Sequence, residues 1–302
     1  MGSKIKTHRA GSLEEFFSKE AEFSKKAVSL SGKPRDGLGV LYRGQADASW
    51  LLETTLERCS EDYFSFSKYF SFLQRLNLPA LDFLKLMTPG LFKNDFDVID
   101  KNILAAFAYV RHIGGPSPLL DWTQDRDIAL FFAFSNIPEM AKHVNVFVYL
   151  NGSLPGRVIA SIPRVPLIRT VSHEEANKLS THFNHILQKS EYTYCIFGGG
   201  SSDIVFASHE ERLKIARGEK AFKGADLCIK FSLPICLRKE VFEYLKRKDI
   251  NEYNLFRSDG AYVRTKWVEL FGVKKTASEK KHETKAFLRL NGIAHKKIRN
   301  KK

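Results

Sequence analysis

The chain has 302 residues, of which 43% are hydrophobic and 12% aromatic, enough to bury one large core or two modest ones. Its formal net charge of +14 points to an anionic partner, most simply a nucleic acid, or serves solubility alone. The longest apolar run, residues 128–134, is far too short to span a bilayer, and the polar, basic start MGSKIKTHRA does not read as a signal peptide, so we expect a cytoplasmic protein with no membrane partner.

Helical patterns dominate the first half of the chain. Ser12 and Glu15 have the spacing of a capping box, ahead of a helix over residues 13–30. A turn over 31–37 and a strand that carries Arg43 and ends at Gly44 come next, and Trp50 is predicted to fill the core. Further helices are predicted at 61–75, 77–90, 96–115 and 124–137, with a short extended piece at 116–123.

Strand patterns become more frequent in the second half. Strands are predicted at 144–150, 156–163, 191–197 and 225–234, a loop at 198–203, and helices from 172, over 236–250 and over 259–271. Because helices come early and strands late, we expect an α+β fold in a single domain, with a helical N-terminal half and a mixed or antiparallel sheet at its core. We place this domain at residues 1–272.

The last 30 residues, 273–302, form a basic tail. They hold 11 Lys or Arg and two Glu, and so carry nine of the 14 net positive charges. Such a tail can contact phosphates or be a solvated end, and the sequence leaves both readings open.

The cysteines argue against a zinc or redox motif. Cys59, Cys195, Cys228 and Cys236 show no two-residue spacing, so we expect no metal site. We interpret the four as buried thiols of a reducing cytosol.

Three polar clusters sit at predicted element boundaries. Arg43 stands in YRGQ (42–45), where a rigid guanidinium beside a glycine suits a phosphate or carboxylate. His112, Asp121 and Thr123 lie in the segment 111–123, and Glu191 opens the strand at 191–197. Each has a structural alternative, namely a strand-end charge, a helix cap or a charge that suits the helix dipole. Because ligand sites gather at element ends, we predict that these five residues converge on one cleft.

The segments YRGQADASWLLETTLER, RHIGGPSPLLDWTQDRDIALFFAF and LQKSEYTYCIF, in this order, resemble the FRG domain, named for its Phe/Tyr-Arg-Gly motif. The resemblance extends over roughly Ser12 to Phe271, including a late stretch that ends on Asp259-Gly260. Two positions depart from the family's usual pattern. Arg111 stands where Gln is usual, and Pro116-Ser117-Pro118 replaces Pro-Thr-Arg.

A second, weaker resemblance concerns ADP-ribosyltransferases of the Arg–Ser/Thr–Glu type. Arg43, Thr123 and Glu191 appear in the order of that family's motif. The resemblance implies NAD as substrate, an ADP-ribosyltransferase-like fold, and catalytic roles for these three residues. It places NAD against a set of residues around the first two clusters and the start of the late strand: Tyr42, Arg43, Gly44, His112, Asp121, Trp122, Thr123 and Tyr192.

The chemistry of NAD fits such residues. An arginine can grip a pyrophosphate bidentately, and a carboxylate such as Glu191 stabilises the oxocarbenium-like state formed when the nicotinamide–ribose bond breaks. A hydroxyl such as Thr123 could fix the position of that carboxylate. Trp122, Tyr192 or Tyr194 could stack on nicotinamide, or each could simply fill the core.

We therefore expect an NAD-dependent ADP-ribosyltransferase that modifies a macromolecule, with nucleic acid, RNA in particular, favoured over protein. Transferases of this kind serve as toxins or antiviral defence effectors, so an inhibitory protein partner is a further expectation. The alternative is a noncatalytic module that binds a nucleotide or nucleic acid. A hydrolase that uses His112 and Asp121 is a more distant alternative, because no Ser or Cys nucleophile stands in a recognisable motif.

Overall fold

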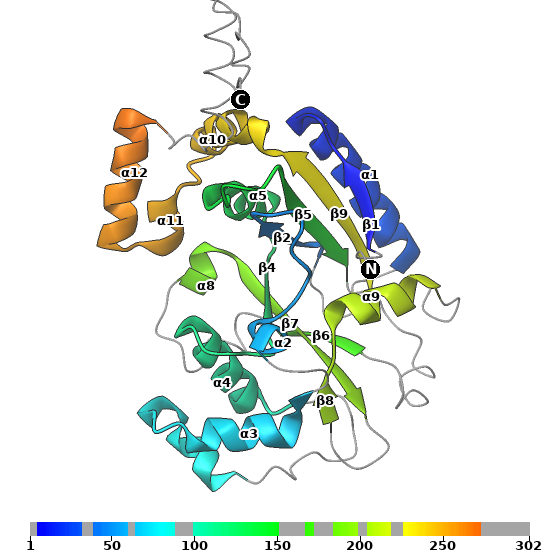
Figure 1. The fold of residues 1–302 in the computed structure, drawn as a ribbon, viewed down its shortest axis with the longest axis vertical. Coiled ribbons are helices and arrows are strands. Elements are labelled where there is room, and N and C mark those ends of the chain that lie inside the picture. The colour runs from blue at the N-terminus through cyan, green and yellow to red at the C-terminus, as the bar shows by residue number, and fades with distance from the viewer. Residues whose placement is uncertain are drawn as a thin grey trace, which may run out of the picture.

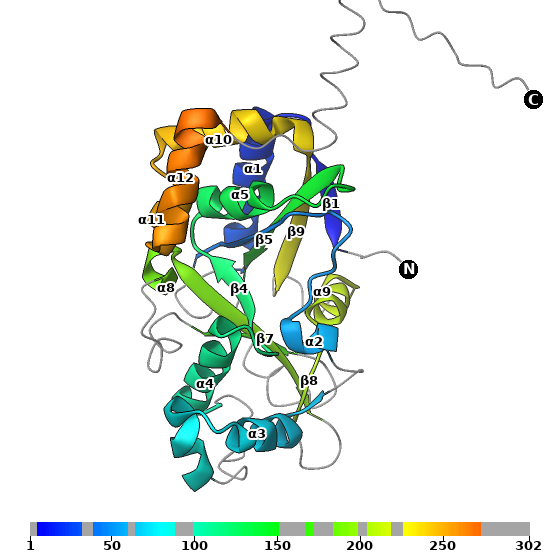
Figure 2. The same cartoon turned by 60° about the vertical axis from the view of Figure 1, so that its left-hand side comes forward.

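The computed structural model describes residues 5–31, 39–59, 64–87, 99–150, 167–171, 184–198, 204–218 and 226–272. Within them the protein is an α+β fold around one mixed sheet of nine strands (Figures 1 and 2). The strands are β1 (Lys6–Arg9), β2 (Leu41–Gln45), β3 (Phe64–Ser65), β4 (Leu120–Thr123), β5 (His143–Leu150), β6 (Leu167–Val171), β7 (Ser190–Gly198), β8 (Ile204–Phe206) and β9 (Leu227–Pro234).

The sheet consists of two halves that meet at a single residue pair. Its order is β1-β9-β5-β2-β4-β7-β8-β3, with β6 also paired to β7. β1 and β9 run parallel, and every other pair is antiparallel. All five residues of β2 pair with β5, whereas β2 meets β4 only at Tyr42 and Thr123. Beyond that pair β2 and β4 diverge, so the sheet is split between them.

Helices surround both halves of the sheet. They are α1 (Leu13–Ser31), α2 (Thr55–Cys59), α3 (Phe66–Arg75), the 3₁₀ helix η1 (Pro79–Leu86), α4 (Lys101–His112), α5 (Arg126–Ser135), α8 (Asn184–Leu187), α9 (His209–Gly218), η3 (Ile235–Leu237), α10 (Arg238–Arg247), α11 (Glu252–Phe256) and α12 (Asp259–Phe271). Figure 1 shows α1, α5 and α10 with the β1–β9–β5 half at the top, and α3 and α4 with β7 and β8 below.

The core is divided in the same way. Alternate residues of β5, Val144, Val146 and Val148, face α1, α5 and α10, as the two-residue period of a strand requires. The side chains between them, Phe147 and Tyr149, belong to a second cluster on the opposite face. A third cluster packs α3, η1 and α4 against β7 and β8. Each half of the sheet thus has an apolar cover, and the second cluster, which holds Leu41 and Phe147 from one half and Leu120 and Trp122 from the other, spans the junction between them.

Helix starts follow local capping chemistry. The backbone N–H of Glu15 donates to Ser12 Oγ (3.1 Å), which confirms Ser12 as the cap, and the Glu15 carboxylate accepts from the Gly11 N–H (2.8 Å), one residue before the N–H used in a capping box. Asp125 caps α5 by accepting from the backbone N–H groups of Asp127 and Ile128. Both helices therefore begin where the sequence pattern placed them.

Most long elements predicted from the pattern are confirmed: the helix at 13–30, the helix at 96–115 in shorter form, the helices at 124–137, 236–250 and 259–271, the extended piece at 116–123, and the strands at 144–150, 191–197 and 225–234. Several expectations are wrong. Within the segment 77–90, Pro79–Leu86 form a 3₁₀ helix, and the helix expected at 61–75 begins only at Phe66. The first half is not purely helical, because β1 to β4 all lie before residue 124. Polar β1 gave no strand signal, since it forms by pairing with β9.

Some expectations fall on residues outside the described ranges. These are most of the turn at 31–37, the strand at 156–163, the greater part of the segment from 172 to 190, the loop at 198–203 and the basic tail at 273–302.

All four cysteines are free, but only Cys195 is buried. Cys228 is half-buried, and Cys59 and Cys236 are exposed, so the expectation of four buried thiols is wrong. None of the helices in the described ranges combines the length and apolarity needed to cross a membrane.

Candidate functional site

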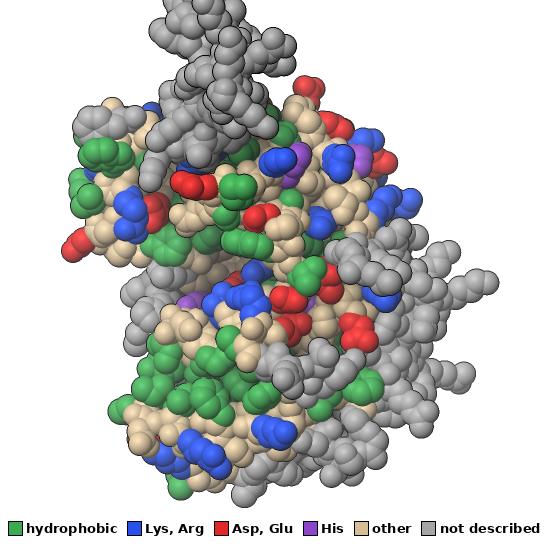
Figure 3. Space-filling model, in the orientation of Figure 1, with side chains coloured by type: hydrophobic (Ala, Val, Ile, Leu, Met, Phe, Trp, Pro, Cys, Tyr) green, Lys and Arg blue, Asp and Glu red, His purple; other side chains and the backbone are tan. Residues whose placement is uncertain are grey.

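A cleft of about 770 Å³ opens at the split between the two halves of the sheet. Its walls come from β2, the segment that follows β2, the end of α4, β4, and the start of β7. In Figure 3, basic and acidic side chains meet in the hollow between the upper and lower parts of the molecule. A volume of this size is within the range of small-ligand pockets.

The cleft gathers residues that are up to 150 positions apart. All the residues predicted to contact a dinucleotide line it: Tyr42, Arg43, Gly44, His112, Asp121, Trp122, Thr123 and Tyr192. Of the five residues predicted to converge, four are present in this wall, and the fifth, Glu191, is not.

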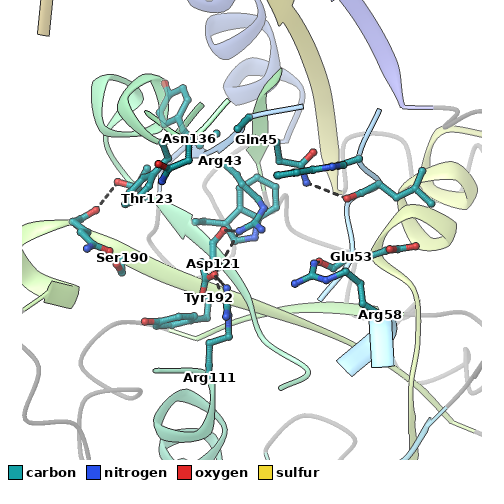
Figure 4. Close-up of a pocket in the computed structure, with 18 of the residues that line it drawn as sticks. Arg43, Gln45, Glu53, Arg58, Arg111, Asp121, Thr123, Asn136, Ser190 and Tyr192 are labelled. Carbon is teal, nitrogen blue, oxygen red and sulfur yellow. Dashed lines mark hydrogen bonds and ion pairs between the residues drawn. The ribbon is translucent and has the colours of Figure 1, made fainter. Parts of the chain in front are cut away.

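Asp121 is the ionic centre of the cleft. It accepts from Arg111 Nη2 at 2.7 Å and from Arg111 Nε at 3.2 Å. Arg43 comes from the other half of the sheet, and its Nη1 donates to the Asp121 carbonyl oxygen at 2.6 Å and lies 3.7 Å from the carboxylate. The two arginines and one carboxylate therefore bridge the split, as Figure 4 shows.

The charges of this centre influence one another. Burial lowers the pKa of the Arg43 guanidinium, Arg111 and Arg58 lower it further, and Asp121 opposes them. Burial alone would raise the pKa of Asp121, but the charges of Arg111 and Arg43 outweigh it and hold that pKa below its ordinary value. Asp121 is thus ionised at neutral pH, and it balances only one of the two cations beside it.

Arg58 adds a third cation on the opposite wall, together with Glu53 (Figure 4). Its Nη1 donates to the Glu53 backbone oxygen at 3.0 Å. Burial and the neighbouring Glu57 raise the pKa of Glu53. Three guanidinium groups against two carboxylates leave the middle of the cleft with an excess of positive charge, which suits an anionic ligand.

The other end of the cleft is polar but uncharged. Asn136, Gln188, Ser190 and Thr123 line it. The Thr123 hydroxyl donates to the Gln188 backbone oxygen (2.7 Å) and accepts from the Asp125 N–H (3.1 Å), so it joins β4 to the start of α5. The structural alternative for Asp121 and Thr123, helix capping, is wrong, because the cap of α5 is Asp125.

Two of the predicted stacking residues are held in the wall by their polar groups. The Tyr192 hydroxyl lies 3.2 Å from His112 Nε2 and 2.5 Å from His185 Nδ1. Burial and the charge of Asp121 raise the pKa of Tyr192, so the phenol stays neutral.

Trp122 is fixed by a buried chain of hydrogen bonds. Its indole N–H donates to Thr193 Oγ1 at 2.8 Å. Because an indole can only donate, Thr193 Oγ1 is the acceptor in that bond, and it also lies 3.0 Å from His209 Nε2. His209 Nδ1 then lies 3.7 Å from the Glu57 carboxylate. Tyr194 is likewise a buried core residue. All three aromatic rings are 2–3% exposed and belong to the core.

Glu191 lies behind the cleft wall. It follows Ser190 and precedes Tyr192, which both line the cleft, so strand alternation turns its side chain to the opposite face. It is 1% exposed, and its Oε1 accepts from Gln124 Nε2 at 2.6 Å. Its strand is separated from that of Arg43 by β4 alone, a distance of about 10 Å from the spacing of strands.

The prediction that the strand ends at Gly44 is wrong. β2 continues to Gln45, and the backbone of helix α5 closely approaches Gly44. A Cβ at this position would lie 2.0 Å from the Ala129 oxygen and 2.5 Å from the Ala133 nitrogen. The glycine is therefore required for packing between β2 and α5.

Several lining residues were missed by the sequence reading. Arg111 was seen only as a departure from a family pattern, and Arg58 and Glu53 gave no signal. Gln45 directly follows the Arg-Gly pair, and its carbonyl oxygen Oε1 is buried without a partner among the described residues. Trp50, predicted to lie in the core, is 49% exposed and lines the cleft. No cluster of three His, Cys, Asp or Glu side chains in the described ranges has the arrangement of a metal site.

The family model of the FRG domain matches residues 39–142. Residues 39–142 are an FRG domain. This domain supplies Arg43, Arg58, Arg111 and Asp121, and hence the charged part of the cleft. The uncharged part is completed from outside it, by Gln188, Ser190 and Tyr192. No curated protein and no solved structure matches the chain.

Proposed function

We propose that the cleft binds NAD and that the protein transfers ADP-ribose from it to a macromolecule, with nucleic acid, RNA in particular, favoured over protein. The observation that carries the proposal is the position of Arg43. Its guanidinium stands at the split of the sheet, within a cleft that also holds Arg111 and Arg58. Its Nε is buried without a partner among the described residues. A pyrophosphate satisfies such a group and the excess positive charge around it.

The layout of the cleft suits the two ends of a dinucleotide. The arginines can hold the phosphates, and the uncharged end, with Asn136, Gln188 and Ser190, offers hydroxyl and amide groups to a ribose or a carboxamide. In the proposed reaction the bond between ribose C1′ and nicotinamide breaks, and nicotinamide leaves with the bonding electrons. An acceptor oxygen or nitrogen then bonds to C1′ and loses its proton.

The order of strands also supports an ADP-ribosyltransferase-like arrangement. Arg43, Thr123 and Glu191 lie on β2, β4 and β7, which are neighbours in the sheet. Glu191 stands between two residues that line the cleft, Ser190 and Tyr192. To contact the ribose directly, the Glu191 side chain has to rotate into the cleft, which requires a local change at the start of β7. A carboxylate there stabilises positive charge that develops at C1′.

One observation favours a second candidate function, a noncatalytic module that binds a nucleotide or nucleic acid. Glu191 is buried, engaged by Gln124, and outside the cleft. A binding module needs the arginines but has no use for a carboxylate near the ribose.

The first test is to incubate the full chain with NAD labelled in its adenylate phosphate, together with total RNA, DNA or cell protein. We expect loss of NAD and transfer of label to nucleic acid. Absence of both NAD cleavage and transfer, with NAD still bound, identifies the binding module. Absence of binding rejects both candidates.

The Glu191→Gln variant separates catalysis from binding. It keeps the size of the side chain and removes the charge, so we expect the rate to fall about 10²–10³-fold with little change in NAD affinity. The exposed Glu240 on α10 provides the control, Glu240→Gln, which should leave both quantities unchanged. A normal rate in Glu191→Gln would remove Glu191 from the mechanism.

The Arg43→Lys variant tests the anion site. Lysine keeps the charge but lacks the planar fork of guanidinium, so NAD should bind about 10-fold more weakly or worse. Arg247→Lys, on the exposed face of α10, is the matched control and should bind normally. Equal NAD affinity in both variants would mean that Arg43 does not hold the pyrophosphate.

A further inference from the structure

Trp50 is placed unlike the other tryptophan at the cleft. Trp122 is 3% exposed and bonded to Thr193, whereas Trp50 is 49% exposed at the cleft wall. The neighbouring Leu51 is also 44% exposed. A half-exposed indole at a cleft presents a large, rigid apolar surface to whatever enters.

The loop that carries Trp50 is held on both sides. Its backbone groups are bonded to β2, to β5 and to α9, within 3.1 Å in each case: Ala48 N–H to the His143 oxygen, Asn145 Nδ2 to the Ala48 oxygen, Gln45 Nε2 to the Leu51 oxygen, and Leu52 N–H to the Glu210 carboxylate. Asp47 closes a turn inside the loop by accepting from the Ser49 N–H at 2.8 Å. The exposed indole is therefore preorganised, because fixed backbone stands directly before and after it.

The same hydrogen bonds tie this loop to the arginine site. Gln45, which holds the Leu51 oxygen, is two residues from Arg43 on β2, so both side chains leave the same face about 7 Å apart. Arg58 follows on the other side of the loop and lines the cleft as well. A phosphate held by Arg43 and Arg58 thus has its attached nucleoside within reach of Trp50.

We propose that Trp50 is the stacking platform for the nucleobase of the nucleotide that binds in this cleft. The proposal rests on the proposed function, since it takes the phosphates to lie at the arginines. The three predicted stacking residues, Trp122, Tyr192 and Tyr194, are 2–3% exposed and engaged in the core, whereas Trp50 offers an exposed ring. Stacking accepts any base, because every base has a π face, so Trp50 contributes affinity for the nucleoside part and little base selectivity.

The test measures the binding of three probes to the full chain by calorimetry: NAD, ADP and inorganic pyrophosphate. We expect Trp50→Ala to weaken NAD and ADP binding on the order of 5- to 150-fold and to leave pyrophosphate binding unchanged. Trp50→Phe keeps an aromatic ring and should retain most of the affinity. Trp267, 60% exposed on α12 and away from the cleft lining, provides the control Trp267→Ala, which should bind all three probes normally.

Three outcomes overturn the inference. Unchanged ADP affinity in Trp50→Ala shows that the base does not stack on Trp50. An equal loss of ADP and pyrophosphate affinity shows that Trp50 shapes the arginine site instead. A wild-type protein that binds none of the probes rejects the proposed function and the inference with it, whereas the first two outcomes leave the proposed function standing. Quenching of tryptophan fluorescence by ADP in the wild type, lost in Trp50→Phe, gives an independent confirmation.

Discussion

A single carboxylate, Asp121, lies between two guanidinium groups at the centre of the cleft. Arg111 binds it through two nitrogens, and Arg43 reaches it from the other half of the sheet. Removing the negative charge leaves both cations without their counterion in a partly dry site, which costs more than the ion pairs themselves contribute. Asp121 is 36% exposed in its side chain, so solvent moderates that cost.

We predict that Asp121→Asn lowers the free energy of unfolding by about 1–3 kcal/mol at pH 7. The pKa of Asp121 is held below its ordinary value of about 4, so its ion pairs stabilise the fold above that pH and are lost as the pH falls through the lowered pKa. The variant should therefore lose part of the wild type's dependence on pH below about 4. Urea unfolding between pH 3 and 7 measures both effects.

Asp82 provides a control for this measurement. It forms an exposed ion pair with Lys85 one helical turn away, so Asp82→Asn should change stability by less than about 0.5 kcal/mol. If Asp121→Asn behaves like Asp82→Asn, Asp121 is a surface charge and the cleft is wetter than the structure shows.

At the scale of elements, the position of Arg43 depends on how α5 packs against β2. Gly44 lets the backbone of α5 approach the strand so closely that no other residue has room. Arg43 precedes Gly44 on β2 and points to the other side of the strand, toward the cleft. The Arg-Gly pair thus combines a residue that lines the cleft with the packing contact that fixes its strand.

We predict that Gly44→Ala lowers the free energy of unfolding by about 3 kcal/mol or more, or prevents folding. The added Cβ would meet the Ala129 oxygen and the Ala133 nitrogen, which are backbone atoms of α5 and cannot rotate away. Gly39 is the matched control, because nothing lies within 4 Å of a Cβ placed there. Thermal and urea unfolding of the two variants should differ clearly, and equal stability would contradict the packing role.

At the scale of the whole molecule, the cleft exists because two covered half-sheets meet at one residue pair. Tyr42 and Thr123 form the only register pair between β2 and β4 in the described structure, so the strands part beside it. The polar residues of both strands are left facing the gap, where backbone groups and side chains are open to a ligand. The apolar clusters pack around the site, and two of their members, Trp122 and Tyr192, also line it.

The net charge is also a property of the whole chain. If the tail at 273–302 contacts nucleic acid, its removal should weaken binding to all sequences alike. Each lost phosphate contact should reduce the slope of log K against log salt by about 0.7–0.9. Titrations of single- and double-stranded probes at several salt concentrations, with the full chain and with residues 1–272, measure this slope. An unchanged slope means that the tail is only a solvated end.

Local patterns alone were sufficient for much of the fold and, in the charged part of the site, for Arg43 and Asp121. Residues with strong periodicity, such as 101–112 and 143–150, form the predicted elements because their hydrophobic spacing allows one way of burying them. Arg43, His112, Asp121 and Thr123 were predicted to share a cleft because polar residues at element ends gather where ligands bind, and all four line it.

The direction in which each side chain points and the pairing of the strands were decided only by the tertiary structure. Trp50 and Glu191 show this in opposite directions: the indole predicted to be buried is exposed, and the carboxylate predicted to line the cleft is buried behind it. Which side of β7 meets the cleft depends on its register with β4, and where Trp50 points depends on hydrogen bonds to Gln45, His143 and Glu210. These contacts join residues distant in sequence, and a local pattern carries no information about them.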